Sequence, residues 1–273
     1  MLQVIRKVIG SAGDCQTAKI IGKLNEKKLL ERCFKMESSQ DFYHLFQPII
    51  NTNFPEKPIG YEAFIRNRHE KNPLKIFEKA RKNNSLLEID LHSINCALKY
   101  ADSSNSAYHL FINIFPSTLV SDAFLALLDK IVNKPVILEI NEANEETTIW
   151  NNPLLKKNIL LLQEHNIKWA LDDVGTGQAS IQRIFEYQPN YIKLDKYFSN
   201  ELSARKEKQK VVTFFVDLTK YMGSHFILEG IEKETDLKIA KELGVRNVQG
   251  FLFGKPQKEI SHPRSDCCAS KVN

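Results

Sequence analysis

Alternation between strand-like and helix-like segments is the feature that most constrains how this chain can fold. From residue 109 onward, short apolar runs alternate with longer segments whose apolar residues recur at helical spacing. The predicted strands cover residues 109–113, 136–140, 167–171, 191–194, 226–228 and 247–248. The predicted helices lie between them, at residues 117–132, 154–165, 180–187, 206–222 and 234–243. This order is typical of a parallel α/β sheet, either closed into a barrel or open and doubly wound.

Two further strands precede this series, at residues 43–50 and 59–66. Only a turn at residues 51–58 joins them, so we expect them to be antiparallel neighbours. They bring the count to eight strands, which favours a closed (β/α)8 barrel of the TIM type. Further helices are predicted at residues 23–32, 74–82 and 86–100.

Composition places the chain among ordinary globular proteins. It has 273 residues, of which 42% are hydrophobic and 26% charged. The net charge of +5 is too small and too dispersed to predict DNA binding. No run approaches the roughly 18 apolar residues of a membrane span, and the five cysteines lack metal-ligand spacing. We therefore expect reduced thiols and a cytoplasmic location.

Three segments are predicted. Residues 23–260 form the barrel domain, and residues 261–273 form a polar C-terminal tail. Residues 1–22 are an N-terminal extension, which could be a linker from another module, a docking segment or a remnant of expression.

Polar residues follow or interrupt nearly every apolar strand. The adjacent acids Asp172 and Asp173 end one strand and precede a Gly-x-Gly turn. Neighbouring carboxylates repel each other and lose hydration, and divalent cations offset both costs. The other residues of this kind are Glu62, Asn113, Glu139, Lys193, Glu229 and Gln249. Strand ends meet at one face of a barrel, so these residues predict an oxygen-rich site suited to Mg²⁺ or Mn²⁺ rather than zinc.

Several motifs occur together in the order found in one known family. They are residues 46–49 (FQPI), 60–66 (GYEAFIR), 113–116 (NIFP), 138–142 (LEINE), 171–177 (LDDVGTG), 191–195 (YIKLD), 229–232 (EGIE) and 249–256 (QGFLFGKP). With these motifs the chain resembles the EAL domains, bacterial phosphodiesterases that hydrolyse cyclic di-GMP. The resemblance covers most of the chain and implies a barrel whose first strand is antiparallel to the rest.

The resemblance also implies roles for single residues. One divalent cation would be held by Glu62, Asn113, Glu139 and Asp172. A second would be held by Asp172 and Asp173, with Glu229 ordering or activating a water molecule and Lys193 steering its attack. Substrate contacts would come from Gln47, Phe64, Arg66 and Gln249. Glu142 would brace the loop at residues 175–177 and help keep Asp173 on its metal, and Glu232 would support the site.

The implied activity is two-metal hydrolysis of cyclic di-GMP to linear pGpG, since two cations can activate one water molecule and clamp the phosphate. The main alternative is a catalytically silent EAL-like module that binds cyclic di-GMP or a protein partner. The other alternative is an unrelated barrel hydrolase. A homodimer is a family expectation.

Single positions also have simpler interpretations. Asn113 could cap a strand end, and Lys193 or Arg66 could be surface charges. Glu139 and Glu142 could exchange roles. Phe64, Phe115 and Val174 depart from the family pattern without removing a predicted ligand, so they bear on substrate affinity and loop movement.

Overall fold

The first two strands form the antiparallel hairpin that the sequence predicts. Strand β1 (Phe42–Asn51) pairs with β2 (Phe54–Asn67) and, across the closure, with β8 (Asn247–Gln249), both antiparallel. All other neighbouring pairs, from β2 round to β8, are parallel. The computed structural model describes residues 41–103, 108–141, 146–177 and 180–260. Its strand order closes as β1 to β8, which confirms the predicted barrel.

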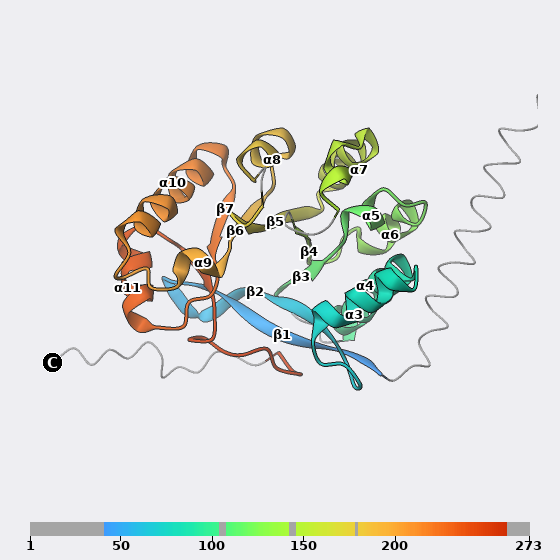
Figure 1. The fold of residues 1–273 in the computed structure, drawn as a ribbon, viewed down its shortest axis with the longest axis horizontal. Coiled ribbons are helices and arrows are strands. Elements are labelled where there is room, and N and C mark those ends of the chain that lie inside the picture. The colour runs from blue at the N-terminus through green and yellow to red at the C-terminus, as the bar shows by residue number, and fades with distance from the viewer. Residues whose placement is uncertain (1–40, 104–107, 142–145, 178–179, 261–273) are drawn as a thin grey trace, which may run out of the picture.

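Helices cover the outside of the strands (Figure 1). The remaining strands are β3 (His109–Asn113), β4 (Val136–Asn141), β5 (Lys168–Val174), β6 (Tyr191–Leu194) and β7 (His225–Leu228). The helices are α3 (Pro73–Lys82), α4 (Leu86–Ser103), α5 (Pro116–Leu119), α6 (Phe124–Ile131), α7 (Pro153–Glu164), α8 (Ser180–Tyr187), α9 (Lys196–Ser199), α10 (Lys206–Met222) and α11 (Glu234–Glu242), with a 3-10 helix, η2, at Thr147–Asn151.

The structure differs from the predicted elements in a few places. The helix predicted at residues 117–132 is two helices, because the chain turns after α5 and the Ser121 hydroxyl donates a hydrogen bond to the Thr118 carbonyl. Strand β5 continues to Val174, so Asp172 and Asp173 belong to the strand instead of following it. Helix α9 and η2 were not predicted, since four or five residues are too short to show a period.

Several expectations fall outside the described residues. These are the helix at residues 23–32, the extension at 1–22 and the tail at 261–273. The domain boundaries stay predictions. In the described part of the chain, no helix has the length and apolar character needed to cross a membrane. The cytoplasmic location and the homodimer also stay predictions.

The barrel interior contains one apolar layer made by alternate strand residues. The buried cluster consists of Ile49, Phe111, Ile137, Ala170, Tyr191 and Ile227, one from each of six strands. On β2 the matching position is Gly60, where a Cβ atom would lie 2.5 Å from the His109 carbonyl oxygen. Side chains on a strand alternate between its two faces, so the next inward-facing position lies two residues further along. Those positions carry the polar residues described next.

Candidate active site

Lys193 lies at the centre of the polar layer. It follows Tyr191 by two residues on β6, and its side chain is fully buried. Its Nζ atom lies 2.9 Å from Glu62 Oε2, 2.7 Å from Glu139 Oε1, 2.9 Å from Asp172 Oδ1 and 2.7 Å from Glu229 Oε1. Four carboxylates, three from β2, β4 and β5 and one from the residue after β7, thus surround one ammonium group. The surface-charge interpretation of Lys193 is wrong.

The carboxylates fall into two groups whose oxygen atoms lie within 4.8 Å of one another. The first group is Glu62, Glu139 and Asp172, and the second is Asp172, Asp173 and Glu229. Asp172 belongs to both groups. The structure therefore brings together the acids that the sequence assigned to two neighbouring cations, with the shared carboxylate at the predicted position.

Burial and like charge make these acids difficult to ionise without a cation. Burial, together with repulsion from Glu62 and Asp172, raises the pKa of Glu139 well above its ordinary value. Burial also raises the pKa of Glu229 well above its ordinary value and the pKa of Asp172 above it, and in both cases attraction to Lys193 opposes the shift.

Glu62 and Lys193 differ from these acids, because the surroundings of each favour its charged form. Burial opposes ionisation of Glu62, but attraction to Lys193 and hydrogen bonds from Lys193, Gln249 and Asn113 outweigh it and lower its pKa. Burial disfavours the Lys193 ammonium, yet the four carboxylates outweigh burial and raise its pKa well above the ordinary value.

The donor set fits a hard divalent cation. An ammonium group has three N–H donors, so it cannot hydrogen-bond four carboxylates at once. Apart from their ion pairs with Lys193, the buried atoms Glu139 Oε1 and Asp172 Oδ1 accept no hydrogen bond from the described residues. Buried oxygens of this kind are suited to Mg²⁺ or Mn²⁺, which prefer carboxylate and amide oxygens.

Amide side chains hold Glu62 in place. Gln249 Nε2 donates to Glu62 Oε2 at 2.9 Å and to Gln47 Oε1 at 3.2 Å. Asn113 Nδ2 donates to Glu62 Oε1 at 3.2 Å and to Glu139 Oε2 at 3.4 Å. To bind a metal, the side-chain carbonyl oxygen of Asn113 has to face the acids. Rotating the side-chain amide by half a turn exchanges its NH2 group for that oxygen. Asn113 thus lies among the predicted ligands and is more than a strand-end cap.

Asp173 adopts an unusual backbone conformation. Its φ angle is +53°, in the left-handed region that non-glycine residues seldom enter. Asn141, at the end of β4, donates a hydrogen bond from Nδ2 to Asp173 Oδ2. Two residues on, Gly175 has φ +97°, and a Cβ atom there would lie 2.4 Å from the Phe198 ring. The loop therefore requires glycine at this position.

The acids open into a cavity of about 830 Å³. Its lining includes the predicted substrate residues Gln47, Phe64, Arg66 and Gln249, together with Glu232. The Arg66 guanidinium lies 5.6 Å from the centre of the Phe64 ring. Arg66 is half-buried in this lining, and its contact with a substrate phosphate stays a prediction. Glu142 lies outside the described residues, and its bracing role stays a prediction.

Helix α3 adds a wall that the sequence interpretation missed. Phe77 and Arg81 line the same cavity as the acids. The Phe77 ring meets the Phe115 ring edge-to-face at 4.9 Å, and the Arg81 guanidinium lies 5.0 Å from the centre of the Phe115 ring. Phe115 therefore packs into this wall. Phe77 and Arg81 are four residues apart and therefore share one face of α3. This spacing is the sequence signal that could have identified them as a pair.

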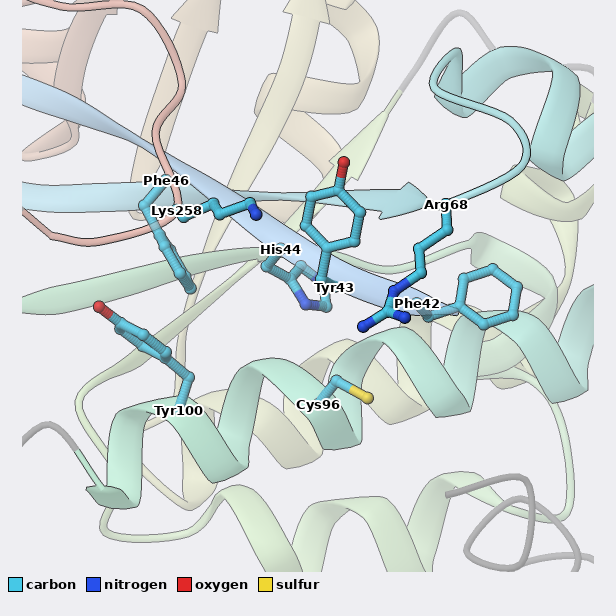
Figure 2. Close-up of a pocket in the computed structure, with 8 residues that line it drawn as sticks. All are labelled: Phe42, Tyr43, His44, Phe46, Arg68, Cys96, Tyr100 and Lys258. Carbon is cyan, nitrogen blue, oxygen red and sulfur yellow. The ribbon is translucent and has the colours of Figure 1, made fainter. Parts of the chain in front are cut away.

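A second cavity, of about 570 Å³, lies on the other side of β1, next to α4. Figure 2 shows Tyr43, Arg68 and Lys258 around it, together with the stacked rings of Phe46 and Tyr100. Its lining contains none of the clustered acids. The chemistry predicted from the sequence therefore belongs to the first cavity.

Comparison with known proteins agrees with this geometry. The EAL domain family matches residues 28–256, so the chain belongs to that family. The cyclic di-GMP phosphodiesterase PdeL of Escherichia coli is 31% identical over 155 residues, covering 55% of this chain and 42% of PdeL. The cyclic di-GMP phosphodiesterase TpdA of Vibrio parahaemolyticus is 26% identical over 215 residues, covering 78% of this chain and 37% of TpdA. The chain thus spans less than half the length of these relatives.

Solved structures show the same fold. A manganese and cyclic di-GMP complex of Klebsiella pneumoniae BlrP1 has 25% sequence identity and a TM-score of 0.72, covering 80% of this chain and 56% of that chain. An EAL domain protein from Listeria monocytogenes has 21% identity and a TM-score of 0.71, covering 85% of this chain and 92% of that chain. Together with the closed strand order, these likenesses confirm the EAL-type barrel.

Proposed function

We propose that this chain is a divalent-metal-dependent phosphodiesterase that hydrolyses cyclic di-GMP to linear pGpG. The observation that carries the proposal is the pair of carboxylate groups sharing Asp172 at the carboxyl ends of the barrel strands. Membership of a family whose relatives are named cyclic di-GMP phosphodiesterases supports the substrate.

Each acid has a proposed role toward the cations. Glu62, Glu139 and Asp172, with the carbonyl oxygen of Asn113, hold the first ion, and Asp172 with Asp173 holds the second. When bound, Mg²⁺ or Mn²⁺ lowers the pKa of a water molecule and neutralises charge on the phosphate. Glu229 orders the water on the side of the second group, because its carboxylate lies in that group and is partly open to the cavity.

Lys193 contributes fixed positive charge. Its ammonium group stays protonated among the carboxylates, since their attraction raises its pKa. In the reaction it steers the attacking water and stabilises the charge that develops on the phosphate oxygens. Without cations, it is the group that balances the four surrounding acids.

The cavity walls hold the substrate. Arg66 contacts a phosphate, a role supported by its place on β2 four residues beyond Glu62. Phe64 gives an apolar surface for part of the nucleotide, and Gln47 and Gln249 lie at the level of the acids. Glu142 and Glu232 support the loop that carries Asp173.

The test is turnover of cyclic di-GMP by the purified chain with Mn²⁺ or Mg²⁺, with the products separated by chromatography. We expect conversion to pGpG and at least about 100-fold slower turnover by Glu62→Gln, because the variant loses a proposed ligand of the ion that stabilises charge on the phosphate in the transition state. Glu56→Gln changes an exposed acid on the same strand and serves as the matched control.

Binding of cyclic di-GMP without turnover, at saturating metal and with the fold intact, would contradict the enzyme and support the silent binding module. Turnover of other phosphodiesters without turnover of cyclic di-GMP would support an unrelated specificity.

A further inference from the structure

The second carboxylate group depends on one strained residue. Asp173 has a left-handed backbone conformation, and this conformation is unfavourable for a residue with a Cβ atom. Strained residues persist where their surroundings hold them, and they gather at functional sites. The Thr176 N–H and hydroxyl both donate to the Asp173 carbonyl oxygen, and contacts of the Asp173 side chain act together with these bonds to keep its carboxylate beside Asp172 and Glu229.

Asn141 makes such a contact from a rigid element. It is the last residue of β4, and in the sheet register it lies opposite Asp172. Its side-chain amide donates to Asp173 Oδ2, and Asn141 lines the same cavity as the acids. The strand that supplies Glu139 to the first group thus also reaches the second group, through a neighbouring side chain.

An amide suits this position for electrostatic reasons. A carboxylate here would add repulsion to a layer that already contains five acids, and an ammonium group would compete with a cation for the same oxygens. A neutral donor orients Asp173 without neutralising it. A carboxylate has two oxygens, so Asp173 can accept from Asn141 and still offer an oxygen to an ion.

We propose that Asn141 is a positioning residue for the second metal site, holding Asp173 in place from strand β4, while the first site does not require it. This inference rests on the proposed function, because it assumes that both carboxylate groups hold cations. It assigns to Asn141 a role that the sequence interpretation gave only to Glu142.

The test is calorimetric titration of Mn²⁺ into the metal-free chain and into Asn141→Ala. We expect two ions to bind the wild-type chain. In the variant, affinity for one ion should change less than about threefold and affinity for the other should fall at least tenfold, within the 10–100-fold range for groups that orient metal ligands. The Mn²⁺ concentration giving half-maximal turnover should rise by a similar factor, with kcat recovering at saturating Mn²⁺.

Two further variants keep the test decisive. Asn141→Leu removes the hydrogen-bond donor with little change in side-chain size. It can therefore be used for the titration when the alanine variant is unstable. Asn247→Ala removes another buried strand asparagine, whose amide donates to the Phe226 carbonyl, and should leave both affinities unchanged.

The inference would be overturned if both Asn141 variants bind two Mn²⁺ ions with unchanged affinity. It would also be overturned if the affinities for both ions fall equally. Absence of Mn²⁺ binding by the wild-type chain would overturn the proposed function instead.

Discussion

Two layers of the barrel interior share their strands and differ in chemistry. The apolar layer includes Ile137 and Tyr191, and the polar layer includes Glu139 and Lys193, each two residues further along the same strand. The apolar layer is buried, and the polar layer is buried at Glu139 and Lys193 but partly open to the cavity at Asp173 and Glu229. The apolar layer stabilises the fold by removing hydrocarbon from water. The polar layer concentrates five acids, four of them around one ammonium group, an arrangement that repulsion and desolvation disfavour.

The difference shows where stability and function separate along each strand. Two residues along the same strand, a packing position becomes a ligand position, as at Ile137 and Glu139. Apolar residues of the first layer should therefore affect unfolding, and the carboxylates of the second should affect cation binding. Lys193 should affect unfolding as well, because without cations it is the countercharge to those carboxylates. The following changes test this separation, from the largest expected effect to the smallest.

Replacing Lys193 by Met should have the largest effect on stability. Without cations, the change leaves four carboxylates facing one another with no countercharge, and loss of one partner of a buried ion pair costs about 3–5 kcal/mol. Urea unfolding at neutral pH in the presence of a chelator measures the loss. An unchanged midpoint would show that these carboxylates take up protons and do not depend on Lys193.

Ile137→Ala and Glu139→Gln compare the two layers on one strand. Ile137 is fully buried, so the alanine variant should lose about 2–5 kcal/mol of unfolding free energy. It should still bind two Mn²⁺ ions. The glutamine variant should keep or gain stability without metal, because it removes a buried acid whose pKa is raised, and should lose affinity for Mn²⁺. The separation of the layers fails if both variants change the same property.

Stability without metal should fall as pH rises from about 4 to 7. Burial and repulsion from Asp172 raise the pKa of Asp173 from 3.8 to about 7. In this pH range the folded chain keeps a proton that the unfolded chain has released, so the free energy of unfolding decreases with pH. Glu139 and Glu229 shift in the same direction, whereas Glu62 shifts in the opposite one.

Added Mn²⁺ should accordingly raise Tm more at pH 8 than at pH 6, because the ion then displaces less of the proton from Asp173. Burial raises the pKa of Asp90, outside this layer, to about 7 as well. Asp90→Asn separates its contribution and should leave the pH dependence of the Mn²⁺ effect intact. An equal Tm increase at both pH values would contradict the raised pKa of Asp173.

Gln249→Ala should have the smallest effect of the series. It removes one hydrogen bond to Glu62, and such a bond contributes about 0.5–1.5 kcal/mol. We expect Mn²⁺ affinity to fall by up to about tenfold, measured by the same titration. A total loss of binding would show that Gln249 does more than orient Glu62.

Much of this arrangement could be predicted from the sequence because it is local. The alternation of strands and helices predicted the barrel, and the acids at strand ends predicted the polar layer. The four ion pairs of Lys193 were not predictable, since they depend on how side chains pack across the closed barrel. The contact of Asn141 with Asp173 was also hidden, although Asn141 lies within the LEINE motif. The break between α5 and α6 depends on the Ser121 hydroxyl bond, which a periodic apolar pattern does not reveal.

The most direct test of the central claim is anomalous diffraction from a crystal of this chain grown with Mn²⁺. We expect two anomalous peaks beside Asp172, with oxygen ligands at about 2.0–2.6 Å, the range for hard divalent ions. One peak should lie near Glu62 and Glu139, and the other near Asp173. No peak at saturating Mn²⁺, or peaks away from these acids, would contradict the claim that the polar layer is a two-metal centre.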